Sequence, residues 1–422
     1  MAGRLVPCRA GSGGGLPGEL RHALWKRNAR RGMIAGHGSR RNRAYPVDMN
    51  GPAAPDPLLA LADVCVQCGL CLPVCPTYQV EAIEAESARG RIAMARALVL
   101  GTVAATEAGE DHLDHCLACR NCEEVCPSGV EYGALLVLAR ERQRARRQPG
   151  FTQRALEWLS ARPRVLAAML WCYRLAWPLL PRALRLLPRP PAARRGPALP
   201  RQGDVALFRG CVAGPYEAGL RDAVGRLCAA AGVVVAEPGG QGCCGALHAH
   251  AGDLAATAAL GARNQRAFAR AGTVLTLASG CHETLEASLR GVAATEDAQV
   301  FLAARVEALA FRPCRERVAL HLPCTQRNGV HSVAATRALL ARVPGLEVVS
   351  LDAGHGCCGA AGTQLATDPA RAARFREPLL AQLHASGATR LLSANIGCRL
   401  HLANGTGMRV QHPLEFLAEQ LS

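Results

Sequence analysis

Two short stretches of this chain spell nearly the same phrase: CVQCGLCLPVCP at residues 65–76 and CLACRNCEEVCP at residues 116–127. Each has the spacing C-x2-C-x2-C-x3-C-P, in which three thiolates of one loop hold three corners of an iron–sulfur cube and the fourth cysteine ligates the other cube. We therefore predict two 4Fe-4S clusters, each completed by the motif of the other. Cluster one takes Cys65, Cys68, Cys71 and Cys126, and cluster two takes Cys116, Cys119, Cys122 and Cys75.

Tetrahedral zinc is the structural alternative, because zinc sites also use C-x2-C pairs. A zinc site would need only one or two such pairs, and it would have no use for the middle cysteine of each triplet or for the proline. The ferredoxin spacing therefore favours iron–sulfur clusters, and iron analysis separates the two hypotheses.

Composition indicates the redox state of the cysteines and the kind of partner to expect. The chain has 20 cysteines in 422 residues and no recognisable secretory leader, so we expect its thiols to be reduced. All but one of its 49 basic residues are arginine, and they concentrate at 1–43 and 139–201, which look like connecting segments. Because no folded module is basic and no aromatic-interleaved binding motif occurs, nucleic acid is not an expected partner.

A second cysteine pattern occurs twice in the C-terminal half, at offsets of 113 to 117 residues. In each copy, short apolar runs end in or precede cysteines, and alanine-rich stretches of helical length separate them. This alternation predicts βαβ units with a parallel sheet, whose functional loops gather at the carboxyl ends of the strands. The candidate ligands are Cys211, Cys243, Cys244 and Cys281 in the first copy and Cys324, Cys357, Cys358 and Cys398 in the second.

The chemistry of these eight cysteines stays open at this point. Each copy contains a GCCG motif, and its glycines allow backbone conformations that bring two adjacent sulfurs to one site. The set can hold a further cluster or a metal, form a redox-active thiol pair, or be buried as small hydrophobic side chains. Nearby histidines are expected to be solvated loop residues: His248, His250, His282, His355 and His401.

The sequence thus predicts a mixed fold. An N-terminal, mainly α-helical, two-cluster ferredoxin-like domain precedes two repeated α/β cysteine-rich lobes with parallel sheets. The expected divisions are a disordered extension at 1–48, the ferredoxin-like domain at 49–147, a basic helical and proline-rich linker at 148–203, lobe 1 at 204–310 and lobe 2 at 311–422.

Two further expectations concern what surrounds the clusters. No dinucleotide-binding glycine motif, phosphate-binding loop or haem-attachment motif occurs, so no flavin or nicotinamide site is expected on this chain. No run of 18 uncharged apolar residues occurs, so we expect no transmembrane helix. The tryptophan-bearing stretch VLAAMLWCYRLAWPLL at 165–180 either lies on an anionic membrane surface or packs against a partner subunit or its own domain.

From about residue 56 to its end, the chain resembles the iron–sulfur subunits of bacterial glycolate oxidase, also called glycolate dehydrogenase. The resemblance is carried by CVQCGLCLPVCPTYQ, HCLACRNCEEVCPSGV, both GCCG motifs and ANIGCRLHLA. It implies an electron-transfer subunit without catalytic residues of its own, whose flavin-containing partner subunits oxidise glycolate to glyoxylate. Electrons then pass toward the respiratory chain, to a membrane acceptor such as a quinone pool, and the chain is cytoplasmic or peripheral on the cytoplasmic face of the inner membrane.

Two departures and two alternatives accompany this resemblance. The family does not need the first 48 residues, and Cys281 is followed by HETL where some relatives of the lobes carry a second cysteine. The similar subunit of anaerobic glycerol-3-phosphate dehydrogenase is one alternative. The other is a catalytic subunit like that of heterodisulfide reductase, which uses similar lobes.

Overall fold

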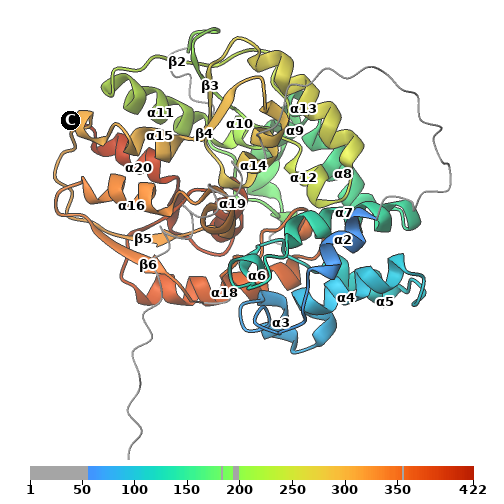
Figure 1. Ribbon diagram of the computed structural model, residues 1–422. Helices are drawn as coiled ribbons and strands as arrows, with labels where there is room; N and C mark the ends of the chain where they lie inside the picture. Colours follow the sequence, from blue (N-terminus) through green and yellow to red (C-terminus); the bar gives the residue numbers. More distant parts are fainter. Residues whose placement is uncertain (1–55, 182–183, 193–198, 354–355) are drawn as a thin grey trace, which may run out of the picture. The chain divides into compact units, whose positions relative to one another are not determined.

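The computed structural model describes residues 56–181, 184–192, 199–353 and 356–422, which belong to one unit of the chain, Pro55–Ser422 (Figure 1). The extension expected at 1–48 lies outside the described residues.

Short helices form the region that carries the two ferredoxin motifs. Side chains cap several of them: Asp56 accepts a hydrogen bond from the amide of Leu58 at 2.9 Å, and Ser87 accepts one from Gly90 at 2.8 Å. Leucines that include Leu58 and Leu135 form a separate small core here. The helices are α2 (Pro57–Asp63), α3 (Pro76–Glu81), the 3₁₀ turn η1 (Glu84–Glu86), α4 (Ala88–Val99), α5 (Glu107–Asp114), α6 (Asn121–Glu124) and α7 (Tyr132–Arg146).

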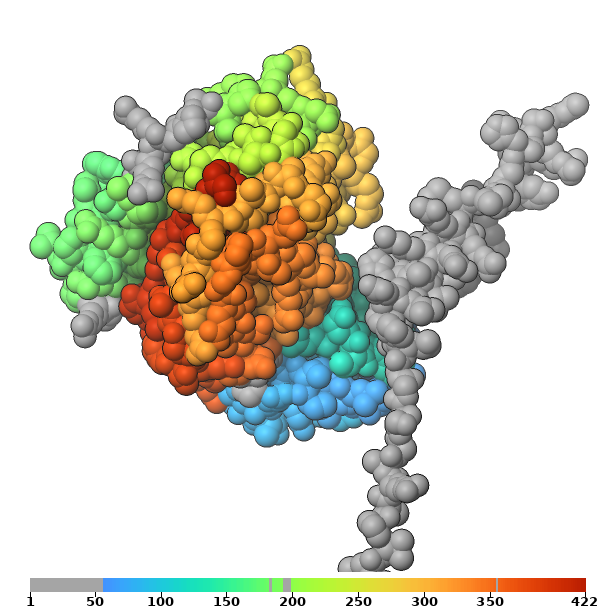
Figure 2. Space-filling view, turned by 90° about the vertical axis from the view of Figure 1, so that its left-hand side faces the viewer, coloured from blue at the N-terminus to red at the C-terminus, as the bar shows by residue number. Residues whose placement is uncertain are grey.

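The segment expected to be a basic linker begins with two more helices, α8 (Phe151–Ser160) and α9 (Pro163–Ala176), followed by the 3₁₀ turn η2 (Trp177–Leu179). Apolar side chains on these elements are unusually exposed, among them Trp171 at 61% and Leu179 at 88%. In Figure 2 this green region stands out at the left edge of the face shown. A search of the described residues finds no helix that combines the length and the apolar character needed to cross a membrane.

Two four-stranded parallel sheets of the same topology follow, which confirms the predicted repeat. The orders are β2-β1-β3-β4 and β6-β5-β7-β8, so the first strand of each copy lies inside its sheet. The predicted apolar runs form three strands of each sheet. The strands are β1 (Val205–Leu207), β2 (Val235–Ala236), β3 (Thr273–Thr276), β4 (Ala294–Asp297), β5 (Arg317–His321), β6 (Glu347–Leu351), β7 (Arg390–Ser393) and β8 (Arg409–Gln411).

Helices cover both sheets, so the inner strands β1, β3, β5 and β7 are mostly buried and apolar, as parallel sheets require. In lobe 1 these are α10 (Ala213–Tyr216), α11 (Ala218–Ala230), α12 (Ala246–His250), α13 (Leu254–Phe268), α14 (Ser279–Leu289), α15 (Ala298–Ala303) and the 3₁₀ turn η4 (Val306–Ala308). In lobe 2 they are the π-helical turn η5 (Gln326–Val330), α16 (Val333–Ala341), α17 (Gln364–Thr367), α18 (Pro369–Ala385), α19 (Ile396–Ala403) and α20 (Pro413–Gln420).

The two lobes share one continuous hydrophobic core, which includes Leu227 and Leu275 of lobe 1 and Leu339 and Phe416 of lobe 2. α11 packs against α20, and α15 packs against α16. The blue and teal helices of the ferredoxin-like region lie against lobe 2 in both views (Figures 1 and 2). A smaller apolar cluster at this junction contains Cys119, Cys357 and Phe375, so the described parts meet around cysteines.

Candidate functional site

The eight ferredoxin-type cysteines line two adjacent hollows. Cys75, Cys116, Cys119 and Cys122, the set assigned to cluster two, line one of them beside Arg91 and Tyr132, and we call it the second hollow. Cys65, Cys68, Cys71 and Cys126 line the other, which Cys122 also reaches. In both hollows the fourth cysteine lies beside the triplet of the other motif, which is the arrangement that interlocked clusters need.

Both motif loops pass through left-handed backbone conformations at the same two positions. Gln67 and Gly69 have φ values of 55° and 84°, and Ala118 and Arg120 have 48° and 61°. A residue other than glycine costs about 1–2 kcal/mol in this conformation. The turn directs backbone amides at sulfur, since the amide of Ala118 lies 3.5 Å from Cys116 Sγ. The two loops therefore present their triplets in the same way.

Burial governs the ionisation of the thiols at the second hollow. Burial raises the pKa of the Cys119 and Cys122 thiols well above the ordinary value. Iron ligation requires the thiolate, so bound metal has to stabilise a charge that the protein alone does not. Two buried arginines bring positive charge to these cysteines: Arg91 lines the hollow, and Arg140 Nη2 donates to the carbonyl of Cys116 at 2.9 Å.

A buried carboxylate fixes Arg91. Glu86 Oε2 accepts from Arg91 Nη2 at 2.6 Å and from Arg371 Nη2 of α18 at 3.0 Å. Its Oε1 lies 2.7 Å from His112 Nδ1 and 2.6 Å from His115 Nδ1. Burial opposes ionisation of Glu86, but these hydrogen bonds and the charge of Arg91 lower its pKa to about 2. Because two arginines already neutralise this carboxylate, we assign it a structural role and not metal binding.

Lobe 2 reaches the second hollow through Asn328 in η5. Asn328 Nδ2 donates to the carbonyl of Cys119 and to Asn121 Oδ1, both at 2.7 Å. Cys119 also shares a buried apolar cluster with Cys357, and Cys324 packs against it. Cys324 and Cys357 of lobe 2 therefore adjoin a cysteine that the motifs assign to cluster two.

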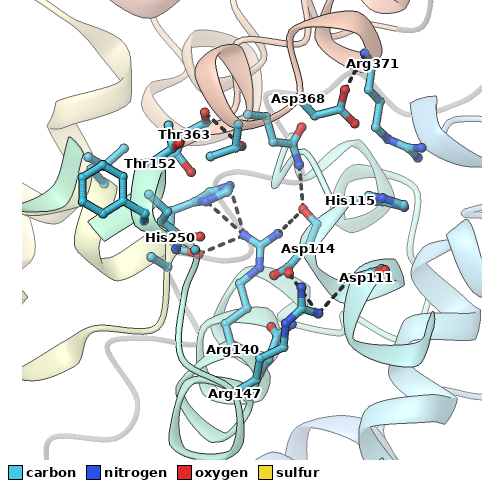
Figure 3. Close-up of a pocket in the computed structure, with 18 residues that line it drawn as sticks. Asp111, Asp114, His115, Arg140, Arg147, Thr152, His250, Thr363, Asp368 and Arg371 are labelled. Carbon is cyan, nitrogen blue, oxygen red and sulfur yellow. Dashed lines mark hydrogen bonds and ion pairs between the residues drawn. The ribbon is translucent and has the colours of Figure 1, made fainter. Parts of the chain in front are cut away.

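A polar pocket joins the ferredoxin-like region to both lobes (Figure 3). Arg140 of α7 donates to the carbonyl of His250 at 2.9 Å, and Gln364 of α17 donates to the carbonyl of Asp114 at 2.6 Å. Arg147 pairs with Asp111 at 2.8 Å. These side chains donate to a carboxylate or to backbone carbonyls of other elements, so the pocket holds the parts together next to Cys116.

In lobe 1 the four cysteines lie together at the carboxyl ends of the strands, as expected. Cys243 and Cys244 are buried, and Cys211 and Cys281 are half-buried around the same small apolar cluster. Hydrogen bonds from Cys211 and Cys244 lower the pKa of the Cys243 thiol well below its ordinary value.

The glycine after each cysteine pair has the conformation that the GCCG motif was expected to need. Gly245 has φ +89° and Gly359 has φ +87°. The glycine before the pair is left-handed only in lobe 2, where Gly356 has φ +73°.

In lobe 2 all four cysteines again lie together. Cys324 Sγ and Cys357 Sγ are 3.9 Å apart, and Cys357, Cys358 and Cys398 are buried. A ring nitrogen of His321 and the Sγ atoms of Cys358 and Cys398 lie within 4.8 Å of one another. Burial lowers the pKa of His321 to about 3, so its ring is neutral at physiological pH.

Sequence reasoning missed His321 and misjudged three of the histidines that it did consider. A comparison of the two copies carries the signal for His321. VALHLPC of the second copy has a histidine where VALFRGC of the first copy has Phe208. The expectation of solvated loop histidines is wrong for His248, His282 and His401, which are buried in helices. His250 is half-buried beneath Arg140, and His355 lies outside the described residues.

Comparisons with known families agree with this geometry. A family model described as a 4Fe-4S dicluster domain matches residues 61–130. A second, described as a cysteine-rich domain, matches residues 205–286 and again residues 318–403. The two matches to one model correspond to the two sheets.

Comparisons with individual proteins extend the likeness over most of the chain. The chain is 30% identical over 383 residues to the glycolate oxidase iron–sulfur subunit of Escherichia coli, covering 85% of this chain and 93% of that protein. It is also 30% identical over 392 residues to the probable glycolate oxidase iron–sulfur subunit of Bacillus subtilis, covering 81% and 88%.

A more distant match is a fumarate reductase (CoM/CoB) subunit from Methanothermobacter marburgensis, which is 27% identical over 222 residues, half of this chain and 45% of that protein. The paired cysteine hollows, the two cysteine-rich lobes and the coverage of the bacterial relatives lead to one conclusion. The chain belongs to the family of glycolate oxidase iron–sulfur subunits.

Proposed function

We propose that this chain relays electrons within a complex that oxidises glycolate to glyoxylate, from flavin-containing partner subunits toward the respiratory chain. The observation that carries the proposal is the pair of adjacent hollows lined by eight cysteines in two interlocked sets. The names of the two bacterial relatives support glycolate as the electron source.

The residues proposed to hold the two 4Fe-4S clusters are those assigned from the motifs. When bound, each cluster supplies one-electron transfer. The protein's own part is to present the thiolates, to offset their charge with Arg91 and Arg140, and to limit access of water to the second hollow. The lobe cysteines are proposed as further metal ligands. The domain boundaries given from the sequence remain a prediction.

The two ends of the relay differ in exposure. Cys68 of cluster one is exposed, and Val66 and Leu70 beside it are exposed at 68% and 54%. Cys119 of cluster two is buried against lobe 2. We therefore propose that a flavoprotein subunit docks over the apolar loop around Cys68 and that electrons enter at cluster one.

The exposed apolar surface of α8, α9 and η2 supports a peripheral membrane contact, from which a quinone pool would be reached. Arg162 stacks over Trp158 and Arg185 over Trp177, each at 4.2 Å from the ring centroid. Arginine beside tryptophan suits an anionic lipid surface. Co-sedimentation with vesicles containing anionic lipid should fall when Trp171 is replaced by alanine. Unchanged binding would contradict the membrane contact and favour contact of this surface with a partner subunit.

A substitution in cluster two tests the relay itself. In a complex reconstituted with the flavoprotein subunits, Cys119→Ser should abolish glycolate-dependent reduction of a downstream dye, while the partner flavin is still reduced in a single turnover. Cys172→Ser is the matched control, because Cys172 is exposed and belongs to no cysteine set. Full turnover in Cys119→Ser would exclude the relay. Turnover of the complex with glycerol 3-phosphate and not with glycolate would show that glycerol 3-phosphate is the electron source.

A second candidate, catalytic disulfide reduction at lobe 1, is favoured by the lowered pKa of the Cys243 thiol. It predicts that the isolated chain, supplied with a reductant, reduces a disulfide, and that Cys243→Ser abolishes this activity with both clusters intact.

A further inference from the structure

The two lobes differ at one position of their cysteine sites. Phe208 of lobe 1 and His321 of lobe 2 both lie three residues before the first cysteine of their copy. Phe208 is 3% exposed and packs against Phe268, with ring centroids 6.3 Å apart. His321 is equally buried, yet a polar ring replaces an apolar one in the core of the sheet. A buried polar group at such a position needs partners.

One partner of His321 is a hydroxyl that fixes its ring. His321 and Ser393 are neighbours across β5 and β7, and His321 Nδ1 lies 3.0 Å from Ser393 Oγ. With Nδ1 occupied by this hydrogen bond, Nε2 is the nitrogen that remains for another contact. Metal-bound histidines commonly hold their second ring nitrogen in this way, which fixes the tautomer and the ring orientation.

Two sulfur atoms lie near the ring. A ring nitrogen of His321 and the Sγ atoms of Cys358 and Cys398 all lie within 4.8 Å of one another. In a tetrahedral zinc site, ligand atoms are separated by about 3.5–3.8 Å, given metal–sulfur and metal–nitrogen bonds of about 2.3 and 2.0 Å. Small side-chain movements bridge that difference. Cys324 and Cys357, which are 3.9 Å apart through their Sγ atoms, are available as further ligands.

This arrangement distinguishes lobe 2 from every other cysteine set in the described residues. Only two groups there bring three potential ligand atoms so close, and the other is Glu86 with His112 and His115, which two arginines neutralise. In lobe 1 the hydroxyl at the matching strand position, Thr276 Oγ1, holds His282 Nδ1 at 2.7 Å, and His282 joins no such group.

We propose that His321 is a metal ligand and that lobe 2 holds a thiophilic transition-metal centre on imidazole and thiolates, with Cys358 and Cys398 as its nearest sulfur ligands. Lobe 1, with Phe208 in place of His321, offers thiols alone. The inference builds on the proposed role of the lobe cysteines as ligands, but it does not depend on the electron source.

Metal analysis of the full chain, isolated without oxygen, tests the proposal first. Two relay clusters account for about eight irons per chain. We expect additional metal at lobe 2: about one zinc or iron for a single ion, or about four irons with sulfide for a cluster. His321→Ala should lose this additional metal and retain about eight irons, whereas His282→Ala should retain both. A wild-type chain with eight irons and no other transition metal would overturn the proposal.

Spectroscopy of the unaltered protein removes any dependence on the folding of variants. If the additional metal is zinc, X-ray absorption at the zinc edge should show nitrogen at about 2.0 Å beside sulfur at about 2.3 Å. If it is iron, pulsed electron paramagnetic resonance should show a nitrogen coupling that changes when the histidines carry nitrogen-15. His321→Cys should keep the metal and lose the nitrogen signal. A centre coordinated by sulfur alone, or a nitrogen signal that survives His321→Ala, would contradict the assignment.

The result is separable from that of the relay. Failure of the relay would show as loss of the eight irons or of dye reduction in the complex. Failure of this inference would leave the eight irons and the dye reduction unchanged, and only the metal bound by imidazole would not be found.

Discussion

Interlocking of the two cysteine motifs can be tested by counting irons in paired substitutions. Cys75 follows the first triplet in sequence but lines the hollow of the second, beside Cys119. Cys68 lines the other hollow. Since four assigned thiolates line each hollow, losing one should remove one cluster, which is about four irons of about eight.

The interlocked arrangement makes the two double substitutions unequal. Cys75→Ala with Cys119→Ala affects the same cluster twice, so it should retain about four irons. Cys75→Ala with Cys68→Ala affects both clusters, so it should retain almost none of the iron that these two clusters hold. Iron and sulfide analysis of the chains, isolated without oxygen, measures the difference, and Cys172→Ala controls for the loss of an exposed thiol.

Self-contained motifs would give the reverse result. If residues 65–75 held one cluster alone, the pair at Cys75 and Cys68 would retain about four irons and the pair at Cys75 and Cys119 would retain none. That outcome would refute the assignment of Cys75 and Cys126, even with both clusters present in the wild-type chain.

Three further substitutions probe the frame around the clusters. Gly359→Ala should lower the free energy of unfolding by more than the roughly 1–2 kcal/mol that a non-glycine residue costs in the left-handed conformation. The added Cβ would lie 2.4 Å from the carbonyl oxygen of Ala372, and thermal unfolding measures the loss. Asn328→Leu removes the hydrogen bonds to the Cys119 carbonyl and to Asn121 Oδ1, about 2 kcal/mol together, and should speed local hydrogen exchange about thirtyfold. Glu86→Gln should lower the free energy of unfolding by about 3 kcal/mol, because the pKa of Glu86 is about 2 in the folded protein against 4.5 ordinarily. This loss should be complete above pH 4.5 and should vanish as the pH falls toward 2, which thermal unfolding across that range measures.

Matched controls accompany these variants. Gly245→Ala has the same backbone conformation, but its nearest contact is Thr257 Cγ2 at 3.3 Å, so it should cost only the backbone strain. Asn404→Leu removes an exposed hydrogen bond and should leave exchange unchanged at the cluster loop. Glu84→Gln removes an exposed ion pair and should show little pH-dependent loss. Equal effects in a variant and its control would contradict the structural reason given for each.

The motifs predicted the fold and the cysteine sets because their information is local. A C-x2-C-x2-C loop specifies its own turn, and a short apolar run followed by cysteine specifies a buried strand and its end. The strands β4 and β8 were not expected, since sequences such as ATED at 294–297 and RVQ at 409–411 are short and partly exposed. They lie at sheet edges, where burial does not impose an apolar pattern.

Contacts between distant segments were not predictable in the same way. Arg371 of α18 meets Glu86 across 285 residues, and Asn328 meets Cys119 across 209. His321 joins Cys358 and Cys398 only because parallel strands bring their carboxyl ends to one edge of the sheet. The repeat held a clue, a histidine aligned with a phenylalanine, but its meaning depends on the neighbour that the fold supplies.

Low-temperature electron paramagnetic resonance, with iron and sulfide counts on the chain isolated without oxygen, tests the central claim most directly. The account predicts at least eight irons with matching sulfide and, after reduction, the signal of two neighbouring four-iron clusters that interact magnetically. A colourless chain that contains zinc without iron and shows no signal after reduction would contradict it.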